Sequence, residues 1–291
     1  MWRSVRRVVC LLLLASALSG CAGTSAFFFY PQSVWISTPA DFGLAYDDVV
    51  LVAHDGTQLH SWWLPAQGDV ADSNTMVLYL HGNAENISSH SRSIYWLVRE
   101  GVSVLALDYR GYGASQGEAL MPSVLQDIEA AAAWMRQQYP HKRLVVLGQS
   151  IGAALAIDFV AAAQERYDID ALVVDAPFTG FAAVARSALS SNLVGWLIWP
   201  LTVFIPSDWD PEKAAGKIRI PVLIMHSPDD QVIPYKQGQK IYEILTHRSG
   251  NVPVCWVQSR GPHIATFAEP ALRLAALQFI RSGQCPAFTV P

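Results

Sequence analysis

Short apolar runs alternate with amphipathic stretches along most of this chain. The runs that are typical of strands cover residues 49–52, 59–64, 76–80, 102–107, 144–147, 169–174, 218–225 and 252–257. Helix-like stretches end before Gly101, follow Ser150, and cover residues 122–138, 235–246 and 270–280. An Asp55-Gly56 pair between the first two strands favours a hairpin turn. This alternation predicts a mostly parallel sheet with helices on both faces, opened by an antiparallel hairpin.

The strand predicted at residues 144–147 leads directly into a Gly-Gln-Ser-Ile-Gly pentapeptide at residues 148–152. A buried strand that turns at once into a buried helix explains the apolar run before the pentapeptide and the small residues after it. The two glycines of such a motif let strand and helix backbones approach closely, so the serine projects from a strained turn. Ser150 is therefore the predicted nucleophile, and a structural turn serine is the alternative.

Polar motifs also follow the other predicted strands. They lie at residues 81–86, 108–113, 175–178 and 226–230, each directly after an apolar run. In open α/β sheets, ligands bind beyond the carboxyl ends of the strands. We therefore expect these motifs and Ser150 to meet at one edge of the sheet.

A serine nucleophile needs a base to take its proton, and the base needs an acid to fix its tautomer. His263 is the predicted base, because it lies after the last strand and before the last helix and can reach back over the sheet end. The acid candidates are Asp229 and Asp230, both in the loop after the strand at 218–225, and the pattern leaves both open. The other histidines near element ends are interpreted as structural: His81, His226 and His247.

An acyl-transfer site also needs two preorganised donors for the oxyanion. The Ile151 N–H follows the nucleophile at a helix N-terminus, where the helix dipole favours negative charge. The second donor is expected from the loop after the strand at 76–80. Asn83 N–H is the predicted donor, with Ala84 as the alternative.

The first twenty residues have the pattern of a secretory signal. Three arginines precede an apolar run, which ends in Leu18-Ser19-Gly20-Cys21. That run is shorter than the ~20 residues a membrane-spanning helix needs. The last four residues resemble the lipobox of bacterial lipoproteins, in which the cysteine is acylated. This resemblance implies a lipid anchor on Cys21. The absence of an aspartate after Cys21 implies, by resemblance to enterobacterial sorting, the periplasmic face of the outer membrane. An ordinary signal peptide or an uncleaved anchor is the alternative.

Removal of residues 1–20 changes the formal net charge from −4 to −7, because it takes away three arginines and no acid. The remaining 271 residues are enough to bury a large core as one domain. Mild acidity without a basic cluster argues against nucleic acid as a partner. Of the four cysteines, Cys255 and Cys285 remain as an even pair that can form a disulfide in an oxidising compartment; two free thiols are the alternative. No Cys/His spacing resembles a zinc site, and no cofactor is expected.

The chain resembles an α/β-hydrolase serine esterase, and within that fold the small hydrolases related to eukaryotic protein depalmitoylating thioesterases. The shared features are Leu64-Pro65, the motifs at 81–86 and 108–113, the pentapeptide at 148–152 and the run from His226 to Pro234. In that branch the acid lies four residues after the strand-end histidine, which implies Asp230. The order Ser150, Asp230, His263 is also the order of this fold.

Two positions depart from the pattern of that branch. Glu85 stands where its oxyanion loop has a second glycine, which puts the loop's shape in question, and Pro262 precedes the base. The depalmitoylating relatives are cytosolic, so their substrate is not carried over to an exported enzyme.

The resemblance and the pattern together divide the chain into three parts. These are a signal at 1–20, a tether and docked arm at 21–45, and one hydrolase domain at 46–291 with a cap at about 178–211. The apolar stretch 193–205 within the cap is interpreted either as a helix packed on the body or as an acyl-binding wall or membrane-dipping lid, and Pro200 is expected to kink or break it.

The sequence thus predicts a membrane-anchored serine hydrolase of carboxylic esters or thioesters. A peptidase or amidase using the same triad is one alternative, and a non-catalytic binding lipoprotein of the envelope is another. Dehalogenase and epoxide-hydrolase chemistry would require a carboxylate where Ser150 stands. The fold alone does not choose among these functions, because function depends on the site.

Overall fold

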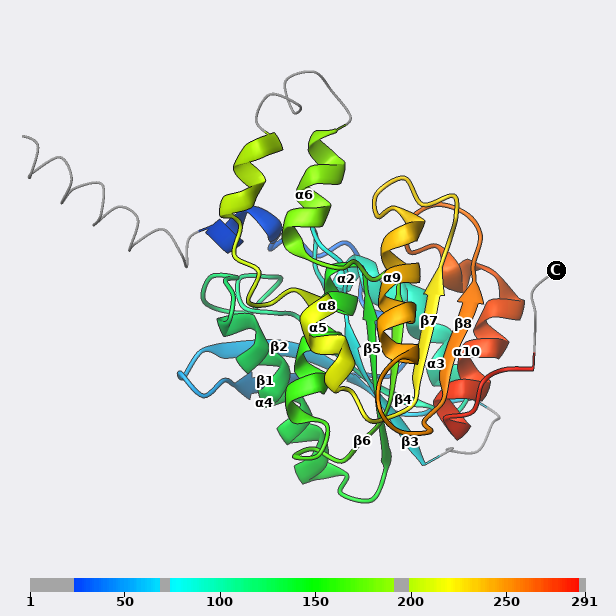
Figure 1. Ribbon diagram of the computed structural model, residues 1–291. Helices are drawn as coiled ribbons and strands as arrows, with labels where there is room; N and C mark the ends of the chain where they lie inside the picture. The colour runs from blue at the N-terminus through cyan, green and yellow to red at the C-terminus, as the bar shows by residue number, and fades with distance from the viewer. Residues whose placement is uncertain (1–23, 69–73, 191–198, 288–291) are drawn as a thin grey trace, which may run out of the picture.

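The computed structural model describes residues 24–68, 74–190 and 199–287 (Figure 1). Within these ranges one sheet contains eight strands in the order β1-β2-β4-β3-β5-β6-β7-β8. β1 pairs antiparallel with β2, as does β2 with β4, and all other neighbours are parallel. This is the predicted mostly parallel sheet opened by a hairpin. The strands are β1 Asp47–Val52, β2 Gln58–Leu64, β3 Thr75–Leu80, β4 Ser103–Leu107, β5 Arg143–Gln149, β6 Ile169–Asp175, β7 Val222–His226 and β8 Val254–Gln258.

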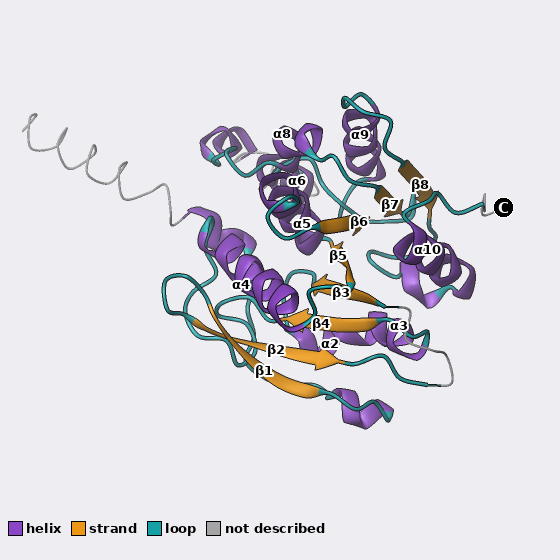
Figure 2. Cartoon of the chain, turned by 90° about the horizontal axis from the view of Figure 1, so that it is seen from below, coloured by secondary structure: helices purple, strands orange, loops and turns teal. Residues whose placement is uncertain are grey.

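Helices cover both faces of the sheet (Figure 2). On one face lie α4, α5 and α9, and on the other lie α3 and α10. The α-helices are α2 Ile87–His90, α3 Tyr95–Arg99, α4 Ser123–Gln138, α5 Ile151–Ala163, α6 Phe181–Leu189, α8 Pro211–Ala214, α9 Tyr235–Thr246 and α10 Pro270–Ser282. The 3-10 helices are η1 Thr24–Phe28, η2 Pro39–Phe42, η3 Ser91–Ile94, η4 Trp199–Phe204, η5 Ala215–Lys217 and η6 Thr266–Ala268.

Two hydrophobic cores lie between the sheet and its helices. On β5, Leu144 and Val146 face one core, and Val145 and Leu147 face the other. Because both faces of this strand are covered, its sequence is apolar throughout instead of alternating. The buried strand therefore carries its carboxyl end, and the residues that follow, at a fixed place on the sheet edge.

Two predicted elements differ from those observed. The helical stretch before Gly101 consists of three short pieces, α2, η3 and α3, because Ser91 and Ser93 return hydrogen bonds to nearby backbone carbonyls. The strand expected at 218–225 begins only at Val222, because Pro221 precedes it and residues 215–217 form η5.

The segment before β1 lies against the body of the protein. The Tyr30 N–H donates to Asn83 Oδ1 over 3.0 Å, and Asn86 Nδ2 donates to the carbonyls of Gln32 and Val34 over 2.9 Å. Residues 24–37 are called the arm below. The arm is thus joined to the loop that follows β3.

The segment predicted as a cap, at about 178–211, contains α6 and η4, and the arm lies beside it (Figure 1). The ring of Phe28 packs edge-on against Phe181 of α6, with 5.0 Å between centroids. Pro200 is the second residue of η4, a 3-10 helix, and Leu201, Val203 and Phe204 are exposed. Residues 193–198 of the apolar stretch lie outside the described residues, as do the signal and Cys21.

Cys255 of β8 and Cys285, beyond α10, form a disulfide. The bond joins the segment after α10 to β8, the edge strand of the sheet. Within the described ranges, no helix is long and apolar enough to cross a membrane.

Candidate active site

Ser150 occupies a strained turn between β5 and α5. Its φ of 56° and ψ of −118° lie in a region that non-glycine residues rarely adopt. A Cβ at Gly148 would lie 2.2 Å from Gly152 O, and a Cβ at Gly152 would lie 2.2 Å from Leu80 O. The two glycines are therefore required by the close approach of the strand ends and the helix, which is the physical reason for the pentapeptide.

Ser150, His263 and Asp230 form a hydrogen-bonded chain across three loops. Ser150 Oγ lies 2.8 Å from His263 Nε2, and His263 Nδ1 lies 2.7 Å from Asp230 Oδ2. The carboxylate can only accept a hydrogen bond, here from Nδ1–H, so it selects the tautomer in which Nε2 is free to accept the serine proton.

Asp230 is held in place by the backbone on its other oxygen. The N–H groups of Val232 and Ile233 donate to Oδ1 over 2.8 and 2.9 Å, whereas Oδ2 faces His263 and, at 3.5 Å, His226 Nε2. Burial raises the pKa of Asp230, but hydrogen bonds from His226 and His263 outweigh burial and hold the pKa below its usual value. Asp230 is therefore a carboxylate at neutral pH.

Asp229, the alternative acid, bonds the backbone of the loop before His263 and not the imidazole. Its Oδ2 accepts the Gly261 N–H over 3.2 Å, and its own N–H donates to Ser227 Oγ. Ser227 Oγ in turn donates to Gly261 O over 2.7 Å. Asp229 therefore braces the turn before His263, whereas Asp230 contacts the imidazole.

The loop after β3 brings Asn83 beside this site. Asn83 Oδ1 accepts from the Ala84 N–H over 2.8 Å and from the Tyr112 hydroxyl over 2.9 Å, in addition to Tyr30. The Ala84 N–H is thus used within the loop. Among the described residues, no hydrogen-bond acceptor faces the N–H of Asn83 or of Ile151. Of the two candidates in this loop, Asn83 retains a donor for a ligand.

Ala84 and Glu85 both have positive φ, 63° and 53°. Glycine adopts this region most easily, and a glutamate there costs roughly 1–3 kcal/mol. Glu85 therefore adopts the left-handed backbone conformation that glycine would adopt at the equivalent position of the thioesterase loop, and this conformation strains the backbone.

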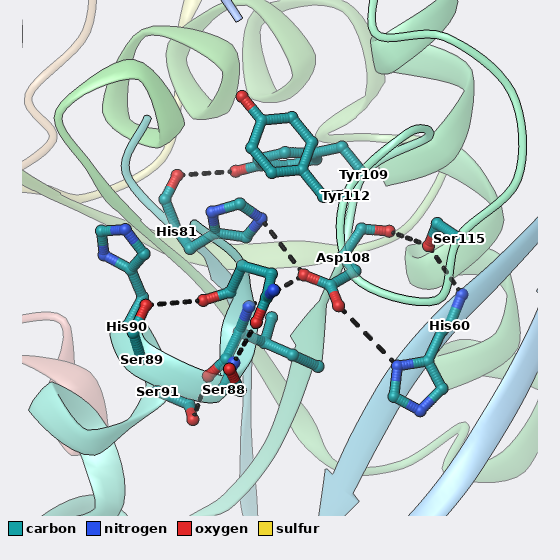
Figure 3. Close-up of polar contacts among 12 residues, drawn as sticks. His60, His81, Ser88, Ser89, His90, Ser91, Asp108, Tyr109, Tyr112 and Ser115 are labelled. Atoms are coloured by element: carbon teal, nitrogen blue, oxygen red, sulfur yellow. Dashed lines mark hydrogen bonds and ion pairs between the residues drawn. The ribbon is translucent and has the colours of Figure 1, made fainter. Parts of the chain in front are cut away.

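A buried polar cluster lies behind the same loop (Figure 3). Asp108 Oδ1 accepts the Ile87 N–H over 2.8 Å and lies 3.6 Å from His81 Nε2, and the Tyr109 hydroxyl donates to His81 O. Burial, with the nearby His90, lowers the pKa of His81 to about 3, so the ring is neutral. His81 thus orients its own loop and takes no part in the Ser150 chain.

A second buried network lies beneath Ser150, and the sequence pattern does not predict it. Gln149 Nε2 donates to Asp175 Oδ2 over 2.9 Å, and Thr266 Oγ1 donates to Asp175 Oδ1 over 2.7 Å. Gln149 Oε1 accepts from the Tyr79 hydroxyl over 2.6 Å and from Ser93 Oγ over 2.9 Å. The only sequence signal for this network was the position of Asp175 at a strand end.

His226 and His247, which are interpreted as structural from the sequence, both contact backbone carbonyl groups. His226 is buried with Nε2 3.1 Å from Ile233 O, and His247 Nδ1 lies 2.7 Å from Glu243 O. In the part of the chain that the structure describes, no group of three or more His, Cys, Asp or Glu side chains is arranged to hold a metal ion.

The comparisons with known proteins agree with this architecture. Residues 71–208 match the α/β-hydrolase family described as serine aminopeptidase, S33. The uncharacterized protein YfhR of Salmonella typhi is 30% identical over 273 residues, which covers 90% of this chain and 86% of YfhR. The lysophosphatidylserine lipase ABHD12 of Danio rerio is 27% identical over 279 residues, which covers 84% of this chain and 73% of ABHD12.

A solved structure shows the same fold. The Pyrococcus furiosus esterase Pf2001 superposes with a TM-score of 0.71 at 24% identity, covering 87% of this chain and 98% of the esterase. The predicted fold class is confirmed by this match and by the sheet order. The chain therefore belongs to the α/β-hydrolase family described as serine aminopeptidase, S33, and is a serine hydrolase.

Proposed function

We propose that this protein hydrolyses carboxylic esters or thioesters through an acyl-enzyme on Ser150. His263 Nε2 takes the proton of Ser150 Oγ as the oxygen bonds to the substrate carbonyl carbon. His263 then gives that proton to the leaving alcohol or thiol as the bond to it breaks. Asp230 stabilises the imidazolium between these two steps.

Water completes the reaction in a second, parallel half. His263 takes a proton from the water as its oxygen attacks the acyl carbon, and then returns a proton to Ser150 Oγ as the acid leaves. In both halves the N–H groups of Ile151 and Asn83 stabilise the negative oxygen of the tetrahedral intermediate. Stabilisation of this kind is the largest single contribution to the rate enhancement in many enzymes.

The observation that supports this proposal is the chain of two contacts from Ser150 to His263 and from His263 to Asp230, 2.8 and 2.7 Å long. The serine also projects from the strained turn that this chemistry uses. A non-catalytic binding lipoprotein is set aside, because the chain belongs to a family of serine hydrolases.

The proposal includes a location and a substrate type. The signal pattern at residues 1–20 and the lipobox-like sequence before Cys21 support an acylated enzyme on the periplasmic face of the outer membrane. The lipase named among the relatives supports an acyl lipid as the substrate.

A peptidase with the same triad is the second candidate, because the family description is that of a serine aminopeptidase. An ester and an amide of the same acyl group distinguish the two functions. They share the acyl-enzyme and differ in the leaving group that His263 must protonate.

The test is hydrolysis of p-nitrophenyl esters from acetyl to palmitoyl and of matched p-nitroanilides by the detergent-solubilised full chain. We expect ester hydrolysis that falls by about 10⁴-fold or more in Ser150→Ala. Faster hydrolysis of the anilides would favour the peptidase. Equal ester hydrolysis by the Ser150→Ala protein would exclude the proposed mechanism.

A further inference from the structure

Two pockets of opposite character lie near the proposed catalytic site: Asn83 lines one, and Ile264, the residue after His263, lines the other. The first, of about 670 Å³, lies between the arm and the cap and reaches Asn83. Phe28 and Tyr30 line it from the arm, and Ala185 and Phe204 line it from the cap. None of the described residues that line it carries a charge. This space is named the apolar pocket.

The second pocket, of about 460 Å³, lies between α3 and the segment that follows His263. Ile264 and Ala265 line it, together with three arginines, Arg92, Arg99 and Arg273. This space is named the arginine pocket. Ile264 Cδ1 lies only 3.5 Å from where a Cβ of Gly82 would be, so the arginine pocket lies beside the loop that carries Asn83.

The three arginines are held by neutral partners. Arg92 lies over the Phe42 ring at 5.0 Å, Arg99 Nη2 donates to Phe42 O over 2.8 Å, and Arg273 Nε donates to Phe267 O. Across the described ranges, no carboxylate forms an ion pair with any of them. In a chain of net charge −4, three unneutralised cations at one pocket create a local positive potential that attracts anions.

The direction of the reaction assigns the two pockets to the two halves of a substrate. His263 must protonate the leaving group, so that group lies on the side of the base loop. Ile264, the residue after His263, lines the arginine pocket. The acyl group remains on Ser150 beside the oxyanion donors, and the apolar pocket reaches Asn83.

We infer that the preferred substrate is a single-chain ester whose acyl chain occupies the apolar pocket and whose anionic leaving group occupies the arginine pocket. This inference rests on the proposed esterase function. Both pocket volumes lie within the roughly 300–1,000 Å³ of small-molecule sites. The anion is a phosphate or a carboxylate, since arginine binds both.

The first experiment compares head groups on one palmitoyl chain with the full-length enzyme in neutral detergent micelles. Lysophosphatidylglycerol offers a phosphate, palmitoyl glycolate offers a carboxylate, and lysophosphatidylcholine is the zwitterionic reference. We expect kcat/KM roughly tenfold higher for at least one anionic ester, since exposed ion pairs are each worth a few-fold. The preference should shrink as salt is raised, because salt screens exposed charges. The faster anionic ester identifies the anion.

The test variant is the double substitution Arg92→Gln/Arg273→Gln. The matched control is the single substitution Arg281→Gln. Arg281 lies on α10 like Arg273 but outside the arginine pocket. The double variant should lose the anion preference, and its kcat/KM should fall less for p-nitrophenyl butyrate, which has no anionic group, than for the anionic esters. Arg281→Gln should keep the anion preference and both activities.

The second experiment fills the apolar pocket with Ala185→Trp, and Ala182→Trp is the control on the same helix, facing a different pocket. In the unaltered enzyme each added methylene should raise kcat/KM by up to about fourfold until the pocket is full. Ala185→Trp should lower kcat/KM for palmitoyl esters about tenfold and leave acetyl esters unchanged. Ala182→Trp should change neither.

The outcomes separate the inference from the proposed function. Ester hydrolysis that requires Ser150 but shows no anion preference, or an equal response of acetyl and palmitoyl esters to Ala185→Trp, overturns the pocket assignment alone. Absence of any hydrolysis that requires Ser150 overturns the proposed function itself.

Discussion

Thr266 Oγ1 lies 2.7 Å from Asp175 Oδ1, and this hydrogen bond joins the segment after His263 to the end of β6. Asp175 also accepts from Gln149, the residue before Ser150. Burial raises the pKa of Asp175, and the bonds from Thr266 and Gln149 oppose that rise. One buried carboxylate thus connects the loop that carries His263 with the turn that carries Ser150.

Thr266→Val should therefore make the loop that carries His263 more mobile, because valine keeps the shape of threonine but cannot donate the hydrogen bond to Asp175. A buried acceptor that loses its donor costs about 1–3 kcal/mol in the free energy of unfolding. We expect kcat to fall more than KM changes, and Thr266→Ser to restore kcat. Denaturant unfolding and ester kinetics measure both effects. A Thr266→Val enzyme with unaltered kcat would show that the bond does not position His263.

Gly152→Ala should destabilise the fold, because its Cβ would lie 2.2 Å from Leu80 O. Forcing a methyl group into such a contact costs about 1–3 kcal/mol or more. Gly216→Ala is the matched control, since its Cβ would meet only Ile244 Cγ2, at 4.0 Å. Equal free energies of unfolding for the two variants would contradict the close approach of Gly152 to the Leu80 carbonyl.

Asp158 on α5 predicts a pH dependence of stability. Burial, with the charge of Asp210, raises the pKa of Asp158 to about 8. The unfolded chain releases this proton near pH 3.9, whereas the folded protein retains it up to about pH 8. The free energy of unfolding should therefore fall as pH rises from about 4 to 8, by at most roughly 1.4 kcal/mol per unit. Asp158→Asn should flatten this slope; parallel profiles for the two proteins would argue against it.

The choice between the two acids is testable with one pair of variants. Asp230→Asn should lower kcat about 10⁴-fold, because an amide favours the wrong imidazole tautomer. Asp229→Asn leaves the contact between Asp230 and His263 in place, so kcat should fall only a few-fold. A larger loss in Asp229→Asn than in Asp230→Asn would reverse the assignment.

Much of the fold is predictable from local pattern. The stretch at residues 235–246 forms α9 with the expected bounds, and the strands around Ser150 are apolar because both of their faces are buried. The placement of the predicted Ser150, Asp230 and His263 follows from the rule that strand ends gather at one edge.

The remainder depends on contacts between distant segments. Nothing near Thr266 in the sequence indicates that it bonds Asp175, 91 residues away. The hydrogen bond between Tyr30 and Asn83 is likewise not predictable from local sequence, because 53 residues separate the two positions. The break of the predicted helix at Ser91 and Ser93 reflects a local competition for backbone carbonyls that apolar periodicity does not register.

The most direct test of the central claim is covalent labelling of Ser150. The enzyme is treated with a fluorophosphonate, which transfers its phosphonyl group to an activated serine and releases fluoride, and the modified peptide is identified by mass spectrometry. We predict one modification, on Ser150, that is absent in Ser150→Ala and slowed in His263→Ala and Asp230→Asn. Labelling of a different serine, or labelling of Ser150 at the same rate in all of these variants except Ser150→Ala, would contradict a serine activated by His263 and Asp230.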